Sequence, residues 1–96
     1  MRVPAAVLDF LRERFRKVAP GARLFLFGSR NDDAAKGGDI DVLVLSRRRI
    51  PARALRLARI AFCERFGEQR LDLLNFRFAD ESPFKQLAML EGTEFS

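Results

Sequence analysis

The chain contains no histidine and a single cysteine, Cys63, among its 96 residues. Without histidine, neither a Ser-His-Asp nor a Cys-His catalytic arrangement can be built, so acid-base or metal chemistry falls to carboxylates. One thiol cannot form an internal disulfide and has no second thiol or imidazole with which to bind a metal. We therefore expect Cys63 to be a small core residue of a helix, in a protein of the reducing cytoplasm.

The sequence also lacks a long hydrophobic run, since no stretch approaches the roughly 18 consecutive apolar residues that can span a bilayer. Its first residues, Met1 to Pro4, lack the apolar core of a secretory signal. The length suits one small hydrophobic core and leaves no room for a second. We expect a single domain over residues 1–96, with no membrane contact and no separate substrate domain.

Basic residues outnumber acidic ones, with 18 Lys and Arg against 13 Asp and Glu and a formal net charge of +5. Such a balance suits a polyanionic partner, whether a nucleotide, a nucleic acid or an acidic protein, and does not choose among them. A solvated helix face is the simpler interpretation of the main basic cluster, because no exposed aromatic residues are interleaved with it. The cluster consists of Arg47, Arg48, Arg49, Arg53, Arg56 and Arg59.

The pattern of apolar residues predicts short strands that alternate with amphipathic helices. Strands are expected at residues 23–27, 39–45 and 69–78, and helices at residues 4–18, 51–66 and 84–90, with a helical turn at residues 30–35. Residues 93–96 either fray or add a short edge strand. The ten Phe are assigned to the core. The side of the second long helix that should meet the sheet consists of Ala54, Leu57, Ala58, Ala61 and Phe62.

A glycine-serine pair ends the first expected strand. Gly28 has no side chain to keep a phosphate away from the backbone. The Ser29 hydroxyl and the amides of the following turn can bind phosphate oxygens. Arg30 offers a fork of donors for the same anion. Alone, such a turn is common in proteins that bind no phosphate, so its weight depends on what lies beside it.

An Asp-x-Asp motif begins the second expected strand. Side chains alternate faces along a strand, so Asp39 and Asp41 project from one side with α-carbons about 6.6 Å apart, at roughly 3.3 Å per residue. Ile40, Val42 and Val44 point the other way, into packing. Carboxylate oxygens without sulfur or imidazole favour magnesium or manganese over zinc.

Asp72 is the best candidate for a third carboxylate, since it is a lone acid in the apolar third strand. A helix connects that strand to the Asp-x-Asp strand, which is a suitable spacing for neighbours in one sheet. A third ligand would complete a two-metal site with ions about 3.5–4 Å apart. We assign Asp72 as a ligand of the second metal ion and as the group that takes the proton from the hydroxyl that accepts the transferred group. The competing interpretation is that Asp72 pairs with an arginine.

Three segments carry a resemblance to a known family: Phe27-Gly28-Ser29-Arg30, Gly38-Asp39-Ile40-Asp41 and Leu71-Asp72-Leu73. They resemble the signature of the nucleotidyltransferase superfamily typified by DNA polymerase beta. The match is nearest to its small bacterial members, the minimal nucleotidyltransferase (MNT) proteins found beside HEPN-domain toxins. The resemblance implies an α+β fold like the polymerase beta palm, with a small mixed β-sheet of three to four strands and the order α-β-α-β-α-β-α.

The same resemblance implies a function and a set of site residues. Gly28 and Ser29 would bind nucleotide phosphates, and Asp39, Asp41 and Asp72 would hold two Mg²⁺ ions. The implied protein is a protein adenylyltransferase that moves AMP from ATP to a hydroxyl of a partner HEPN toxin and so acts as an antitoxin. The resemblance leaves three points open: whether Mn²⁺ replaces Mg²⁺, whether another nucleoside triphosphate replaces ATP, and whether a second copy of the chain is also a partner.

Three other functions are weighed against this one. A non-catalytic antitoxin, or a nucleotide-binding scaffold, would neutralise its partner by binding alone. An enzyme acting on a small-molecule hydroxyl is disfavoured by the absence of a further domain. A basic nucleic-acid-binding module is also disfavoured, and strong salt dependence of binding without nucleotide turnover would support it.

Overall fold

The structure is a computed structural model that describes residues 3–27, 40–67 and 69–96. The helices and strands expected from the sequence are all found close to their expected bounds. The helical turn expected at residues 30–35 lies outside the described residues. In chain order, the elements are α1 (Ala5–Val18), β1 (Arg23–Phe27), β2 (Ile40–Ser46), α2 (Ala52–Phe66), β3 (Leu71–Arg77), α3 (Pro83–Glu91) and β4 (Thr93–Glu94).

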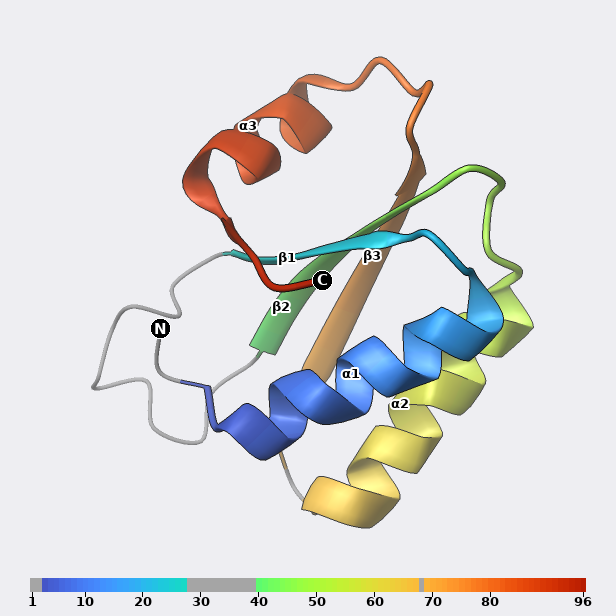
Figure 1. Cartoon of the computed structure of the whole chain (residues 1–96), viewed down its shortest axis with the longest axis vertical. Helices are drawn as coiled ribbons and strands as arrows, with labels where there is room; N and C mark the ends of the chain where they lie inside the picture. Colours follow the sequence, from blue (N-terminus) through green and yellow to red (C-terminus); the bar gives the residue numbers. More distant parts are fainter. Residues whose placement is uncertain (1–2, 28–39, 68) are drawn as a thin grey trace.

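The four strands form one mixed sheet in the order β3-β2-β1-β4 (Figure 1). β1 runs antiparallel to β2 and β4, whereas β2 and β3 are parallel. Helix α2 supplies the crossover that a parallel pair of strands requires. The end of the chain adds the edge strand β4, which is fastened by a two-point ion pair: the Arg23 guanidinium donates to both Glu94 carboxylate oxygens at 2.8 and 2.9 Å.

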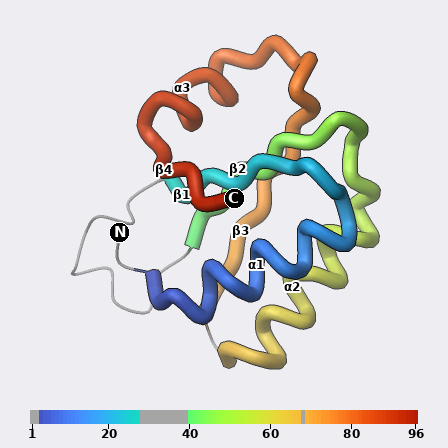
Figure 2. Tube along the Cα trace, in the orientation of Figure 1, coloured from blue at the N-terminus to red at the C-terminus, as the bar shows by residue number. Residues whose placement is uncertain are grey.

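The helices cover both faces of the sheet, with α1 and α2 on one face and α3 on the other (Figures 1 and 2). The larger core lies under α1 and α2, and it contains Ile40, Val42 and Val44 as predicted. A smaller cluster joins Ala88 of α3 to the opposite face of the same strands. Among the described residues, no helix combines the length and hydrophobicity that a membrane span requires. The sheet residues of the smaller cluster are Phe25, Leu43 and Leu45.

Helix α2 buries a narrower stripe than the sequence suggested. Its buried residues are Ala58 and Phe62, whereas Leu57 is 48% exposed and Cys63 is exposed. Each residue along a helix turns by about 100°, so a stripe centred on Ala58 and Phe62 carries their neighbours outward. The predictions that Leu57 faces the sheet and that Cys63 belongs to the core are therefore wrong.

The assignment of every phenylalanine to the core is also wrong. Phe78 and Phe84 are each 43% exposed. Phe84 belongs to α3, the single short helix on its face of the sheet (Figure 2), and Phe78 directly follows β3. The Phe84 ring still packs against Phe27 and Phe76, whereas much of Phe78 faces the solvent.

Helix α3 has a defined start and stop. The Ser82 hydroxyl accepts a hydrogen bond from the Lys85 amide at 3.2 Å, and Pro83 occupies the first turn. The helix ends at Gly92, as predicted. A Cβ atom there would lie 2.6 Å from the Ala88 carbonyl oxygen, so close backbone approach requires glycine at this position.

Candidate functional site

Asp41 and Asp72 lie directly opposite each other on the parallel strands β2 and β3. Register partners project from the same face of a sheet, and neighbouring strands are about 4.8 Å apart. Both residues are half-buried. The structure therefore brings together two of the three acids singled out in the sequence, on the face that α3 partly covers.

The residues around this pair place it at the end of that face. On the other side of Asp41, the register partner is Phe27, the last residue of β1. Phe27 stacks edge-on with Phe84 of α3, with ring centroids 5.7 Å apart. Further along β2, Leu43 is fully buried in the small cluster. The two carboxylates therefore lie at the border between the apolar cluster under α3 and the edge of the sheet at which β2 and β3 start.

The other predicted site residues are Gly28, Ser29, Arg30 and Asp39, and all four lie outside the described residues. The described chain stops at Phe27 and resumes at Ile40, on neighbouring antiparallel strands. Both ends of this interval are therefore at the same edge of the sheet as the Asp41 and Asp72 pair. The roles of these four residues in binding phosphate and metal remain predictions.

The carboxylate of Asp72 has no ion-pair partner within the described part of the chain. The competing interpretation, in which Asp72 pairs with an arginine, therefore finds no support there. The residues described include no group of three metal-ligating side chains close enough to share an ion. Asp39, the third predicted ligand, lies outside the described residues.

Two described carboxylates away from this acid pair have lowered pKa values. Hydrogen bonds from Arg23 lower the pKa of Glu94 to about 2, with a smaller contribution from Ser96. The backbone amide of Arg77, and then its side chain, lower the pKa of Asp80. Both acids are held by surface ion pairs, which shows that these shifts report local structure rather than catalysis.

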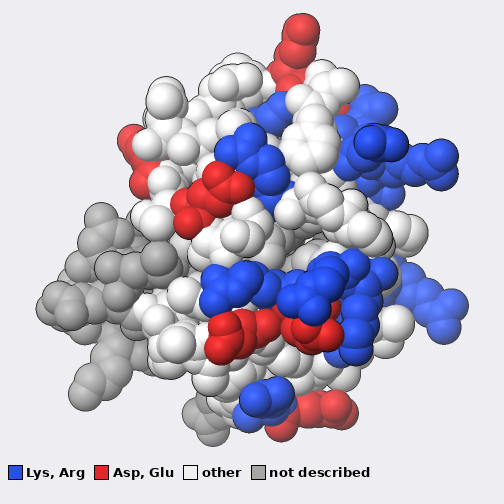
Figure 3. Space-filling view, in the orientation of Figure 1, with Lys and Arg blue, Asp and Glu red and all other residues white. Residues whose placement is uncertain are grey.

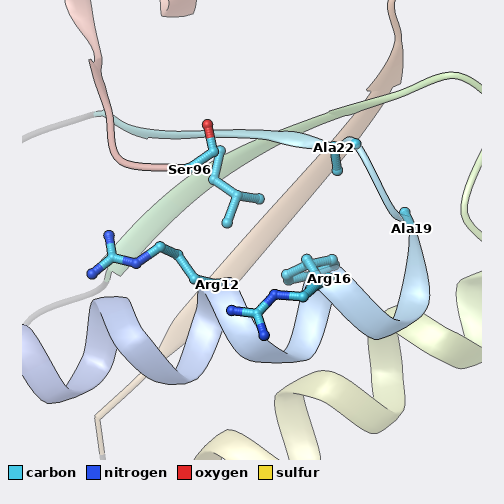
Figure 4. A pocket seen from close by; sticks show the side chains of 8 residues that line it. Arg12, Arg16, Ala19, Ala22 and Ser96 are labelled. Atoms are coloured by element: carbon cyan, nitrogen blue, oxygen red, sulfur yellow. The ribbon is translucent and has the colours of Figure 1, made fainter.

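A small cavity of about 210 Å³ lies between α1 and the end of the sheet. Arg12 and Arg16 extend from α1 on one side of it, and Ser96 lies on the other (Figure 4). Arg12 donates a hydrogen bond of 2.6 Å from Nη1 to the carbonyl of Phe95. This contact fastens the residues that follow β4 to α1, so the cavity is a feature of packing and contains neither acid of the site.

A larger hollow of about 670 Å³ lies at the turn between β2 and α2, at the opposite end of β2 from Asp41. Arg47, Arg48 and Arg49 line it together with Phe78. Sequence reasoning found the arginines and missed the aromatic residue. The signal was present, because Phe78 follows the strand that runs parallel to β2, and parallel strands end at the same edge of a sheet.

The class of protein follows from a family match that spans nearly the whole chain. Residues 6–93 match the family described as "Nucleotidyltransferase domain", and the chain belongs to this family. No curated protein matches the chain in sequence.

Several solved structures share the fold. A chain from the complex of tri-AMPylated Shewanella oneidensis HEPN toxin with MNT antitoxin has a TM-score of 0.70 and 17% identity, over 96% of this chain and 71% of that one. A chain from a MntA-HepT toxin-antitoxin structure has a TM-score of 0.71 and 16% identity, covering 97% and 72%. A chain from a toxin-antitoxin structure with AMP-PNP has a TM-score of 0.73 and 18% identity, over 93% of this chain and 72% of that one. The predicted α+β nucleotidyltransferase fold is confirmed.

Proposed function

We propose that this protein is a metal-dependent nucleotidyltransferase that moves AMP from ATP to a hydroxyl of a partner HEPN toxin and thereby acts as an antitoxin. One observation carries the proposal: Asp41 and Asp72 are register partners on adjacent strands, at the edge where β1 ends. Like charges directly opposite each other on paired strands destabilise a sheet. A divalent cation bound between these carboxylates would reduce that repulsion.

The residues present fit a hard divalent cation. Two half-buried carboxylates project from one face of the sheet, and the chain has no histidine and only one cysteine. An all-oxygen donor set suits Mg²⁺, and also Mn²⁺. Asp41 and Asp72, with Asp39, would hold the metal. When bound, it neutralises charge on the triphosphate and favours ionisation of the acceptor hydroxyl.

The protein's own residues would bind and orient the substrates. Gly28, Ser29 and Arg30 would bind the phosphate oxygens. The acceptor oxygen forms a bond to the α-phosphorus while the bond to the pyrophosphate oxygen breaks, and Asp72 takes the hydroxyl proton. This arrangement needs little covalent chemistry from the protein, because positioning and charge supply most of the rate in phosphoryl transfer.

Similar folds support the choice of nucleotide and partner. Among the similar structures, one contains a tri-AMPylated HEPN toxin with its MNT antitoxin, and another contains AMP-PNP. We extend this pairing to the present chain, whose family membership supports a transferase of this kind. The compartment we propose is the cytoplasm, where ATP is available and Cys63 stays a thiol.

The test is transfer of label from α-labelled ATP to a purified HEPN protein encoded beside this chain, with Mg²⁺ present. The chain contains no tyrosine, so any tyrosine-linked label must lie on the partner. The variant Asp41→Asn, Asp72→Asn should lose transfer by several orders of magnitude. A matched control, Asp9→Asn with Glu64→Gln, removes two exposed acids of α1 and α2, the helices on the opposite face of the sheet, and should retain it.

Three outcomes separate the alternatives. Label that persists in the Asp41 and Asp72 double variant contradicts the assigned metal site. Loss of label with full neutralisation of the toxin shows that binding alone silences the partner. Absence of label from the wild-type protein with any nucleoside triphosphate contradicts the enzyme proposal.

A further inference from the structure

The hollow at the turn between β2 and α2 lies apart from the acid pair. Its walls come from three separate segments: the turn after α1, the arginine loop and the residue after β3. Asp41 and Ser46 are five residues apart on β2, or about 17 Å at 3.3–3.4 Å per residue. A ligand in this hollow would therefore not occupy the transferase site.

The three arginines of the hollow are not among the basic residues that surface ion pairs hold. Several basic side chains elsewhere on the surface are paired with acids at 2.6–3.8 Å, as in Arg23 with Glu94 and Arg77 with Asp80. Arg47, Arg48 and Arg49 are exposed and form no ion pair with any carboxylate in the described ranges. Basic side chains gather over this end of the molecule in Figure 3. Coulombic attraction to Arg49 contributes to the lowered pKa of Asp80, after the hydrogen bonds from Arg77, so Asp80 offsets part of the cluster's charge and the remainder faces the solvent.

A buried polar network fixes the loop that carries these arginines. Ser46 is 2% exposed, and its hydroxyl donates to the Arg48 carbonyl at 2.6 Å. The Asn75 amide nitrogen donates to the Ser46 hydroxyl at 3.0 Å, and the Asn75 amide oxygen accepts from the Ile50 amide at 2.8 Å. A loop held in this way loses little conformational freedom when a ligand binds to its arginines.

An exposed aromatic ring completes the hollow. The Phe78 amide donates to the Ser46 carbonyl at 2.9 Å, which fastens the backbone of Phe78 beside the loop, and its side chain is 43% exposed. The sequence shows no aromatic residue among the clustered arginines, but the fold brings this one to them. A charged loop beside an aromatic face matches the two parts of a nucleotide unit, the phosphate and the base.

The surroundings extend the positive surface beyond the hollow. Helix α2 starts beside the loop with no acid in its first turn and no side-chain cap, so its positive end adds to the local potential. Arg53, Arg56 and Arg59 continue the exposed basic surface along α2, over about 9 Å at 1.5 Å per residue. An open, elongated surface of this kind suits a polymer better than a single small anion.

We propose that this surface binds single-stranded nucleic acid, with phosphodiester groups on Arg47, Arg48 and Arg49 and a base stacked on Phe78. Contacts of this kind are independent of sequence, since every base has a stacking face and every nucleotide a phosphate. The proposal does not depend on the transferase function. An acidic protein is the competing ligand, and it would use the arginines without the ring.

The experiment measures fluorescence anisotropy of a labelled oligo(U) and, separately, of a labelled polyglutamate peptide across a salt series. The variant Arg47→Ala, Arg48→Ala, Arg49→Ala should bind oligo(U) at least tenfold more weakly. Its slope of log affinity against log salt should be shallower by about 2, at about 0.7 per phosphate contact. The control Arg14→Ala, Arg16→Ala, Arg65→Ala removes the same charge elsewhere and should bind as the wild type does.

A second variant separates nucleic acid from an acidic protein. Phe78→Leu keeps an apolar side chain and should weaken oligo(U) about tenfold, because it removes base stacking, while leaving polyglutamate binding unchanged. Circular dichroism checks that each variant is folded. The proposal is wrong if wild-type protein does not bind oligo(U) at low salt, if both triple variants bind equally, or if polyglutamate binds as tightly as oligo(U). Transfer of AMP by the loop variant should be unaffected.

Discussion

Replacing Asp72 by asparagine should stabilise the metal-free protein. Asp41 and Asp72 face each other across neighbouring strands, so their charges are about 5 Å apart. Two unit charges at that distance repel by about 0.8 kcal/mol at the dielectric constant of water and about 3 kcal/mol at an effective value of 20. Both side chains are half-buried, which favours a gain of about 1 kcal/mol. For a domain of this size, that raises Tm by about 4–8 °C.

Divalent metal should reverse the order of stability. A ligand at one hundred times its Kd stabilises the folded state by about 2.7 kcal/mol, and a protein that cannot bind the ligand gains nothing. With saturating Mg²⁺ or Mn²⁺, the wild-type protein should therefore unfold at a higher temperature than Asp72→Asn. Thermal unfolding with EDTA and with metal measures both effects, and circular dichroism is the suitable signal because the chain has no Trp or Tyr.

The result that refutes this reasoning is specific. Asp72→Asn that is less stable than wild type in EDTA would show that the carboxylate makes a stabilising contact. Equal stabilisation of both proteins by metal would show that Asp72 is not a ligand. Glu64→Gln, an exposed change on α2, serves as the control for nonspecific loss of one negative charge.

Three further predictions concern stability. Because Arg23 lowers the pKa of Glu94 from 4.5 to about 2, this pair stabilises the fold above pH 4.5 and loses its effect as the pH falls to 2. Acid titration of Glu94→Gln should lack that component, which is below about 1 kcal/mol for an exposed pair. Gly92→Ala should destabilise by about 1–3 kcal/mol in urea unfolding, since the new Cβ would meet the Ala88 carbonyl at 2.6 Å. Ser46→Ala should cost about 1–3 kcal/mol in the same assay, because it removes the buried hydroxyl on which the arginine loop depends.

The sequence predicted most of the fold because its apolar pattern is consistent with one arrangement. Alternation along a strand correctly separated Asp41 from the buried Val42. The pairing of Asp41 with Asp72 is different, because a shift of one residue between β2 and β3 would turn Asp72 to the opposite face, and spacing along the chain does not fix that register. The alignment of β2 with β3 depends instead on the hydrophobic residues of both strands, which pack together in the core under α1 and α2.

The errors arose where one element's environment depends on another. Leu57 was expected to be buried because α2 was considered with the sheet alone, whereas α1 lies on the same face and contributes to the stripe that α2 buries. Cys63 was expected to be buried because a lone thiol often packs as a small apolar residue, but it lies beside that stripe rather than in it. The contribution of Phe78 to the basic hollow depends on the parallel pairing of strands distant in sequence. The roles of Gly28, Ser29, Arg30 and Asp39 rest on the sequence alone.

Strand β2 has the carboxylate of Asp41 near its start, with Asp72 of β3 beside it, and guanidinium groups just beyond its end. The opposite charges at the two ends of this seven-residue strand therefore form a local dipole along it. A polyanion approaching from solution experiences a torque that turns the arginine end toward it, and added salt weakens this orientation. The two ends can thus receive different anions, since a triphosphate is repelled from the acidic end until a cation neutralises it.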